Sequence, residues 1–219
     1  MTYIIHGAPG SGSCIVEAAC AEIGVDYEVR DLDARGNEHR GEAYAALNPQ
    51  RKMPTLEVEG GEIITESAAI VLTLDERHRD AGLLPPPGSP ARAQAVRWML
   101  VFATEFYPVV EIMDYPERFA PAPASPEAMH ERAKEIWHER WLVVERSLAA
   151  SAQPGGSPSM VDSGFSAADL YATLLSRWDL KEDWRRDHLP QVDALAAAVL
   201  ARPSLAAVWK RHKLIKSDS

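Results

Sequence analysis

The sequence has few cysteines and no obvious metal-binding spacing. Its 219 residues include two cysteines, Cys14 and Cys20, which are six residues apart in a segment with a helical pattern. At about 100° per residue they point to different faces of that helix, so no disulfide between them is expected. No C-x-x-C pair is present to form a dithiol enzyme. The seven histidines are scattered, and the spacing predicts no metal site.

Long apolar runs and basic clusters are also missing. The net charge is -9 and the pI is near 5.3, which argues against nucleic acid or an anionic membrane surface as a partner. No stretch of 18 apolar residues occurs, and the start has neither a basic region nor a cleavable apolar region. The composition, 46% hydrophobic and 25% charged, is globular. We therefore predict a cytoplasmic protein that binds neither membrane nor nucleic acid.

The first eighty residues predict an α/β domain. Residues 2–6 have the apolar pattern of a buried strand, and 7–13 form a glycine-rich turn. A helix follows whose apolar stripe ends at Gly24, and residues 26–32 predict a second strand. A weak helix at 43–47 precedes a hairpin of 55–59 and 62–65, and a helix starts at 66. This β-α-β-α-β-β-α order predicts parallel pairing of the first two strands.

The second part of the sequence is helical in pattern. Residues 83–90, Leu-Leu-Pro-Pro-Pro-Gly-Ser-Pro, form a stiff connection without a helical or strand period. We expect one long helix at 91–117, another at 127–150, a loop at 153–158 and two or three shorter helices ending near 213. The predicted division is a domain at 1–79, a linker at 80–90 and an all-helical domain at 91–219.

The dipeptide Met53-Pro54 lies directly before the predicted hairpin. Proline removes a backbone donor, so it belongs at the first position of a strand or at a sheet edge. An X-Pro bond there is a candidate for the cis form, which would leave the N–H and C=O of Met53 free for an extended peptide. The alternative is an ordinary trans proline at the strand entry, because most X-Pro bonds are trans.

Two other segments precede predicted helices and could bind anionic groups. Glu66 and Ser67 open the third helix, where free N–H groups and the helix dipole attract a carboxylate. A simple acidic first turn with a serine cap is the alternative. In the loop at 10–14, Ser11, Ser13 or Cys14 could stabilise a thiolate, although Cys14 could equally be a core residue. The glycines of this loop fit neither nucleotide-binding pattern.

Together, and in this order, these features resemble the cytosolic glutathione S-transferase family over nearly the whole chain. The family has a thioredoxin-like domain with a cis proline before the third strand, a Glu/Gln-Ser pair at the third helix, a linker, and an all-helical domain with an [ST]-x-x-[DE] capping box. Here these features correspond to Met53-Pro54, Glu66-Ser67, residues 83–90 and 166–169. The resemblance thus implies an α/β thioredoxin-like N-terminal domain and an all-α C-terminal domain.

The resemblance also implies roles for individual residues. The main chain of Met53, next to Pro54, would bind the cysteinyl backbone of glutathione. Glu66 and Ser67 would hold its γ-glutamyl end, and Lys52 would lie near its glycyl carboxylate. Ser11 falls where the serine-using classes keep their catalytic hydroxyl. The cysteine-using bacterial class would have its thiol at position 12, which is glycine here, so the cysteine mechanism is not carried over.

The activity implied is glutathione transfer: the thiolate attacks a hydrophobic electrophile, as in detoxification. Glutathione is the expected co-substrate, with no metal, and the protein is expected to be a homodimer whose interface includes the helix at 91–117. Alternatives are a glutathione-dependent isomerase, peroxidase or disulfide reductase, and a non-catalytic glutathione-binding regulatory protein. Glu105 is a candidate contact to a neighbour's glutathione. The candidate wall of the electrophile site, or else ordinary core, comprises Phe106, Tyr107, Met113 and Tyr115.

Overall fold

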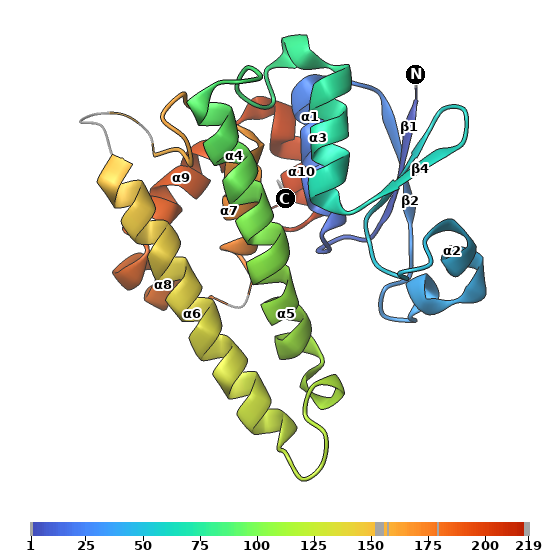
Figure 1. Ribbon diagram of the computed structural model, residues 1–219, viewed down its shortest axis with the longest axis vertical. Helices are drawn as coiled ribbons and strands as arrows, with labels where there is room; N and C mark the ends of the chain where they lie inside the picture. The colour runs from blue at the N-terminus through green and yellow to red at the C-terminus, as the bar shows by residue number, and fades with distance from the viewer. Residues whose placement is uncertain (1, 152–155, 157, 179, 217–219) are drawn as a thin grey trace. The chain divides into compact units, whose positions relative to one another are not determined.

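The computed structural model describes residues 2–151, 156, 158–178 and 180–216 (Figure 1). The chain divides into two compact units, one formed by Met1–Pro87 and Val199–Ser219 and the other by Gly88–Ala198. The first boundary falls within the proline-rich connection. The sequence predicts one helical domain at 91–219, whereas residues from Val199 onward group with the first unit. The reason is that their apolar side chains are buried there against a helix of the first unit.

The first unit contains a four-stranded sheet in the order β2-β1-β3-β4. Its strands are β1 (Tyr3–Gly7), β2 (Tyr27–Asp31), β3 (Thr55–Val58) and β4 (Glu62–Thr65). Strand β1 is parallel to β2, with Tyr3 opposite Tyr27, and antiparallel to β3, with Ile5 opposite Leu56. Strands β3 and β4 are antiparallel neighbours. The predicted parallel pair and the predicted hairpin are both confirmed.

Two long helices cover one face of this sheet. Helices α1 (Ser13–Ile23) and α3 (Ser67–Arg77) lie side by side there, while α2 (Glu42–Leu47) lies on the opposite side (Figure 1). The predicted stripe of α3 is buried: Ile70, Val71 and Leu74 are all inaccessible. Short 3-10 turns, η1 (Glu38–Arg40) and η2 (Arg79–Ala81), complete this part of the chain.

Helix α1 is buried on more than one side. Every residue from Ser13 to Cys20 is buried, although the sequence pattern predicts a single apolar stripe. The difference arises because the sheet and α3 cover one side of α1, while η5 (Pro203–Leu205) and α10 (Ala206–Arg211) cover another. The C-terminal segment contributes Leu205, Val208 and Trp209 to this packing.

The second unit consists of helices. These are α4 (Pro90–Val101), a π-helical segment η3 (Phe102–Phe106), α5 (Tyr107–Asp114), a 3-10 turn η4 (Pro116–Arg118), α6 (Pro126–Ser151), α7 (Ala167–Leu175) and α8 (Glu182–His188), followed by α9 (Pro190–Leu200), which reaches the first unit. The predicted helix at 91–117 thus consists of α4, η3 and α5 in series. The predicted loop at 153–158 lies mostly outside the described residues.

Aromatic side chains fill the core of the second unit. The ring of Phe106 packs against Phe102, Trp137 and Trp141, with centroids 5.0, 5.3 and 5.0 Å away. The predicted capping box at the start of α7 is confirmed, with the Ser166 N–H donating to Oδ2 of Asp169 at 2.8 Å. These contacts explain why aromatic residues recur at helical spacing in this half of the sequence.

Among the described residues, no single helix is both long enough and apolar enough to cross a lipid bilayer. One bent pair, Pro190–Leu200 with Pro203–Arg211, passes the test of length and composition with a 78° angle between its helices.

Candidate functional site

The loop between β1 and α1 requires glycine at two positions. Gly7 ends β1, where a Cβ atom would lie 2.2 Å from the Cβ of Ser13, so no side chain fits. Gly10 has a φ of +78°, in the left-handed region that favours glycine. Between them the chain turns sharply enough to place Ser11 before the amino terminus of α1. The glycine-rich sequence is therefore a steric requirement of this loop.

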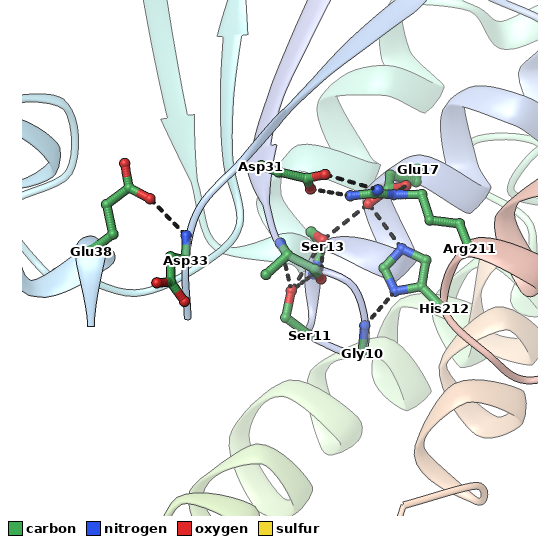
Figure 2. A network of polar contacts seen from close by, with 10 residues as sticks. Gly10, Ser11, Ser13, Glu17, Asp31, Asp33, Glu38, Arg211 and His212 are labelled. Atoms are coloured by element: carbon green, nitrogen blue, oxygen red, sulfur yellow. Dashed lines mark hydrogen bonds and ion pairs between the residues drawn. The ribbon is translucent and has the colours of Figure 1, made fainter. Parts of the chain in front are cut away.

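The hydroxyl of Ser11 is held by its own loop. Its Oγ accepts hydrogen bonds from the N–H groups of Ala8 at 3.3 Å and Ser13 at 3.2 Å, and lies 3.1 Å from Oγ of Ser13 (Figure 2). Ser11 is partly exposed, whereas Ser13 is fully buried. Two N–H groups that donate to one hydroxyl oxygen polarise its O–H bond and make it a better donor. Ser11 is the hydroxyl of this pair that an outside molecule can reach.

The side chain of Ser13 points into the protein. Its Oγ lies 3.0 Å from Oε1 of Glu17 and 3.3 Å from the carbonyl oxygen of Ala8. A hydroxyl has one proton, and the shorter contact leads to the carboxylate, which is the stronger acceptor. Ser13 therefore donates to Glu17 and accepts from Ser11.

Neither cysteine has the surroundings of a reactive thiol. Cys14 and Cys20 have no solvent-exposed surface and form no disulfide. Burial raises the pKa of Cys14 well above its ordinary value, and the nearby carboxylate of Glu17 raises it further. Burial likewise raises the pKa of Cys20 to about 12. A thiol that stays protonated and inaccessible is a core residue, which was the alternative for Cys14.

The peptide bond between Met53 and Pro54 is cis. The cis form is one of the two alternatives that the sequence left open. Met53 is partly exposed, Lys52 is exposed and Pro54 is buried at the start of β3. A second cis bond joins Ala122 to Pro123 in the second unit.

Two side chains fasten the segment that leads to this bond. The Tyr44 hydroxyl and the Asn48 amide group donate to the carbonyl oxygen of Lys52, at 3.0 and 2.7 Å. The same two groups lie 2.7 and 3.2 Å from Oγ1 of Thr55 on the other side of the bond. Both Tyr44 and Asn48 are buried. The segment around Met53 is therefore held at both ends by α2 and the residue after it, a support that sequence reasoning did not find.

Glu66 has an unusual backbone conformation. Its φ of +67° is sparsely populated for a residue with a side chain and costs roughly 1–3 kcal/mol. Its side chain is exposed, whereas Ser67, the first residue of α3, is buried. Its carbonyl oxygen accepts the N–H of Ile70 at 2.9 Å and so begins the helix. Backbone strain of this kind clusters at active sites and ligand clamps, so Glu66 is a candidate binding residue.

The remaining predicted residues lie in the second unit. Glu105 is in the π-helical segment, and its carboxylate forms an ion pair of 2.7 Å with Arg140 of α6. Phe106 and Met113 are buried in the core, which was the alternative for the predicted wall. Tyr107 and Tyr115, the other two residues of the predicted wall, are partly exposed.

Sequence reasoning missed a buried polar cluster beside the loop. It consists of Glu17 in α1, together with Arg211 at the end of α10 and His212 after it, which come from the other end of the chain (Figure 2). The signal that could have found it is Glu17 itself, because a carboxylate inside an otherwise apolar helix needs polar partners. Its partners could not be identified, because they are 194 and 195 residues away in the sequence.

The sheet order, the helices on its face and the cis proline before β3 define the class: a two-unit protein whose first unit has the thioredoxin-like fold. Residues 15–77 match the family model described as glutathione S-transferase, N-terminal domain. The chain is 31% identical over 214 residues to the uncharacterized GST-like protein YncG of Escherichia coli K12, covering 96% of this chain and 98% of that protein. The chain therefore belongs to the glutathione S-transferase family.

Two further proteins are similar to all or part of this chain. A glutathione S-transferase from a sphingomonad, solved in complex with glutathione, has a TM-score of 0.75 and 26% identity, covering 98% of this chain and 100% of that chain. A maleylacetoacetate isomerase from Pseudomonas aeruginosa is 44% identical over 71 residues, which is 32% of this chain and 34% of that protein.

Proposed function

We propose that this protein binds glutathione in its first unit and transfers the glutathione thiolate to a hydrophobic electrophile. The observation that carries the proposal is the position of Ser11: a partly exposed hydroxyl, polarised by two N–H donors, at the amino terminus of a buried helix. The complex of a similar protein with glutathione supports the choice of co-substrate.

In this proposal the tripeptide is held by the residues that the sequence singled out. The main chain of Met53, beside Pro54, pairs with the cysteinyl residue, and the Lys52 side chain neutralises the glycyl carboxylate. The exposed carboxylate of Glu66 binds the γ-glutamyl ammonium group. The Ser67 hydroxyl and the first N–H groups of α3, an eleven-residue helix, bind the γ-glutamyl carboxylate.

Ser11 then acts on the sulfur. Its hydroxyl rotates about the Cβ–Oγ bond and donates to the thiolate, while its oxygen keeps the hydrogen bonds from Ala8 and Ser13. A hydrogen bond to the charged form lowers the thiol pKa, and each unit is worth about 1.4 kcal/mol. The thiol proton leaves to solvent, the sulfur lone pair attacks the electrophilic carbon, and a C–S bond forms as the leaving group departs or a π bond opens.

The test is the substitution Ser11→Ala. Hydrogen bonds to charged groups are worth about 1.5–3 kcal/mol, so we expect kcat to fall about tenfold to a hundredfold while glutathione binding changes little. Steady-state kinetics with a chlorinated aromatic electrophile and calorimetry with glutathione measure the two quantities. Ser125→Ala, an exposed serine of the second unit, is the matched control. Unchanged turnover in S11A would move the role to another residue, and no binding of millimolar glutathione by the natural protein would contradict the proposal.

A second reaction is favoured by one observation, the local similarity to a maleylacetoacetate isomerase. The same thiolate can add to a conjugated double bond, allow rotation about the former double bond, and leave again. Glutathione is regenerated in that reaction and consumed in conjugation. Measuring loss of free thiol against loss of substrate separates the two reactions, and parallel assays with a hydroperoxide and a disulfide test the peroxidase and reductase alternatives.

We also propose a homodimer in which α4 and α5 contribute to the interface and Glu105 approaches the neighbour's glutathione. In support, α4 carries an exposed apolar side chain, Leu100, which is 46% accessible. Sedimentation analysis of the natural protein and of Leu100→Glu tests this point, and a natural protein that sediments as a monomer would contradict it.

A further inference from the structure

The loop that carries Ser11 is hydrogen-bonded to His212, the residue that follows α10. The N–H of Gly10 donates to Nδ1 of His212 at 3.0 Å, and Nε2 of the same ring lies 2.9 Å from Oε1 of Glu17 (Figure 2). Both side chains are removed from solvent, with accessibilities of 0% for His212 and 1% for Glu17. A residue near the end of the sequence thus contacts the main chain of the loop that precedes the first helix.

These two contacts define the tautomer of His212. A peptide N–H can only donate, so Nδ1 must present its lone pair to Gly10. The proton is therefore on Nε2, which donates to the carboxylate of Glu17. An imidazolium ion would place an N–H against the N–H of Gly10, so the arrangement requires the neutral ring.

Glu17 extends this connection to the other side of the loop. Its Oε1 also accepts the Ser13 hydroxyl at 3.0 Å, and its Oε2 accepts Nε of Arg211 at 2.8 Å. Arg211 in turn forms an ion pair with Asp31 at the end of β2, which fixes the guanidinium group. The buried carboxylate is thereby paired on both oxygens and oriented by three side chains.

Ser11 lies between the two anchored residues. On one side Gly10 is fixed through Nδ1 of His212, and on the other side Ser13 is fixed through Glu17. The N–H and the hydroxyl of Ser13 are the groups that contact Oγ of Ser11. Displacement of either anchor shifts the oxygen that has to face the sulfur.

We propose that His212 is a positioning residue for thiol activation, acting through the Gly10 amide. This inference rests on the proposed role of Ser11 as donor to the glutathione sulfur. It assigns to the C-terminal segment a part in catalysis without contact to the reacting atoms. The competing account is that His212 serves only to stabilise the buried charge of Glu17.

Two substitutions separate these accounts. In His212→Asn the amide oxygen can replace Nδ1 as acceptor for Gly10, and in His212→Gln the amide nitrogen can replace Nε2 as donor to Glu17. The positioning role predicts that H212N keeps kcat within about threefold of the natural protein, whereas H212Q loses about tenfold with little change in the KM for glutathione. The opposite order, with H212Q active and H212N impaired, would overturn the proposal.

The matched control is Arg202→Met. Arg202 connects the same C-terminal segment to the far end of α1 through Glu22. If positioning is specific to His212, R202M lowers the melting temperature without changing kcat. An equal loss of kcat in R202M and H212Q would show that docking of the segment, and not the Gly10 contact, matters.

A spectroscopic measurement keeps this test independent of turnover. Nitrogen-15 NMR of the imidazole ring reports its tautomer, and amide exchange of Gly10 reports the hydrogen bond, even if no glutathione reaction is found. We expect the Nε2–H form in the natural protein, and Gly10 exchange that is faster in H212Q than in H212N. A protonated Nδ1 in the natural protein would refute the positioning role while leaving the proposed function intact. Absence of glutathione binding would refute the proposed function and, with it, the role in thiol activation, whereas the ring tautomer and the Gly10 exchange would still report the His212–Gly10 contact.

Discussion

Helix α1 is connected to the C-terminal segment at two places, by Glu17 in its first half and by Glu22 near its end. Glu17 is paired with Arg211 and His212, and its side chain is 1% accessible. Glu22 is paired with Arg202 and Ser204, and its side chain is 12% accessible next to an arginine that is 34% accessible. Both carboxylates pair with a partly exposed arginine, which is 27% accessible in the case of Arg211, but only Glu17 also has a fully buried partner, His212.

This difference in burial explains why the contacts of Glu17 fix the geometry of the loop more strongly than the contacts of Glu22. Solvent near Arg202 screens the charge interaction at Glu22, so its loss is partly replaced by water. At Glu17 the carboxylate and the ring of His212 are removed from solvent, so water replaces a lost partner there less readily, although Arg211 is 27% accessible. The carboxylate also determines where Ser13 and His212 donate. A buried polar cluster is therefore more costly to disturb and more effective in fixing a geometry.

The largest expected effect comes from removing the buried carboxylate. Glu17→Ala leaves Arg211, His212 and Ser13 without their common acceptor, and we expect a loss of about 3 kcal/mol in the free energy of unfolding. Glu22→Ala, the matched change at the outer connection, should lose about 1 kcal/mol. Urea unfolding followed by tryptophan fluorescence measures both. Equal losses at the two positions would show that burial does not distinguish them.

Labelling of the two cysteines gives a local measurement of the same comparison. Burial raises the pKa of Cys14 well above its ordinary value and that of Cys20 to about 12, so the folded protein should not react with iodoacetamide at neutral pH. Because about 1.4 kcal/mol corresponds to a factor of ten, Glu17→Ala should raise the labelling rate by about a hundredfold. Glu22→Ala should raise it by less than about tenfold. Rapid labelling of the natural protein would contradict the burial of both thiols.

The smallest effect concerns acid sensitivity at Glu22. Burial would raise the pKa of this carboxyl, but the hydrogen bonds from Arg202 and Ser204 outweigh it and hold the pKa below the ordinary value of 4.5. The folded state therefore favours the ionised form. Its contribution to stability is present above that ordinary value and is lost as the pH falls through the lower pKa of the folded protein.

Glu22→Gln cannot titrate and provides the reference. We expect the natural protein to be more stable than E22Q at about pH 6, and this advantage to shrink as the pH is lowered to about 3. Unfolding free energies of both proteins at a series of pH values give the difference directly, because Asp31 and the other acidic groups titrate in both. A difference that does not change with pH would exclude the linkage.

Much of the first unit could be predicted because its signals are local. The glycine-rich turn, the two strands on either side of α1, the hairpin at Gly60-Gly61 and the helix at Ser67 each depend on periodicity or turn chemistry within a few residues. The proline at position 54 marked the strand entry, although sequence statistics favoured the trans form that the structure does not have. Tyr44 and Asn48, which fasten that segment, gave no comparable signal, because their function depends on which carbonyl oxygen they reach.

In the second unit, the capping box at Ser166 and the extent of α6 followed from their sequence. The π-helical segment inside the predicted long helix did not, because a single widened turn leaves the apolar spacing nearly unchanged. Phe106 illustrates a related limit. The sequence pattern around an aromatic residue in a helix is the same whether its side chain faces a substrate or, as for Phe106, three other aromatic rings.

The sequence by itself determined the succession of strands and helices, the loop with its serines, and the family to which the chain belongs. Those properties depend on local preferences and on the order of motifs along the chain. Only the tertiary structure decided that the C-terminal segment packs on α1 and places His212 against Gly10. A hydrogen bond between residues 202 positions apart leaves no periodic trace in the sequence. Its partners become evident only when folding brings them together in a place from which water is excluded.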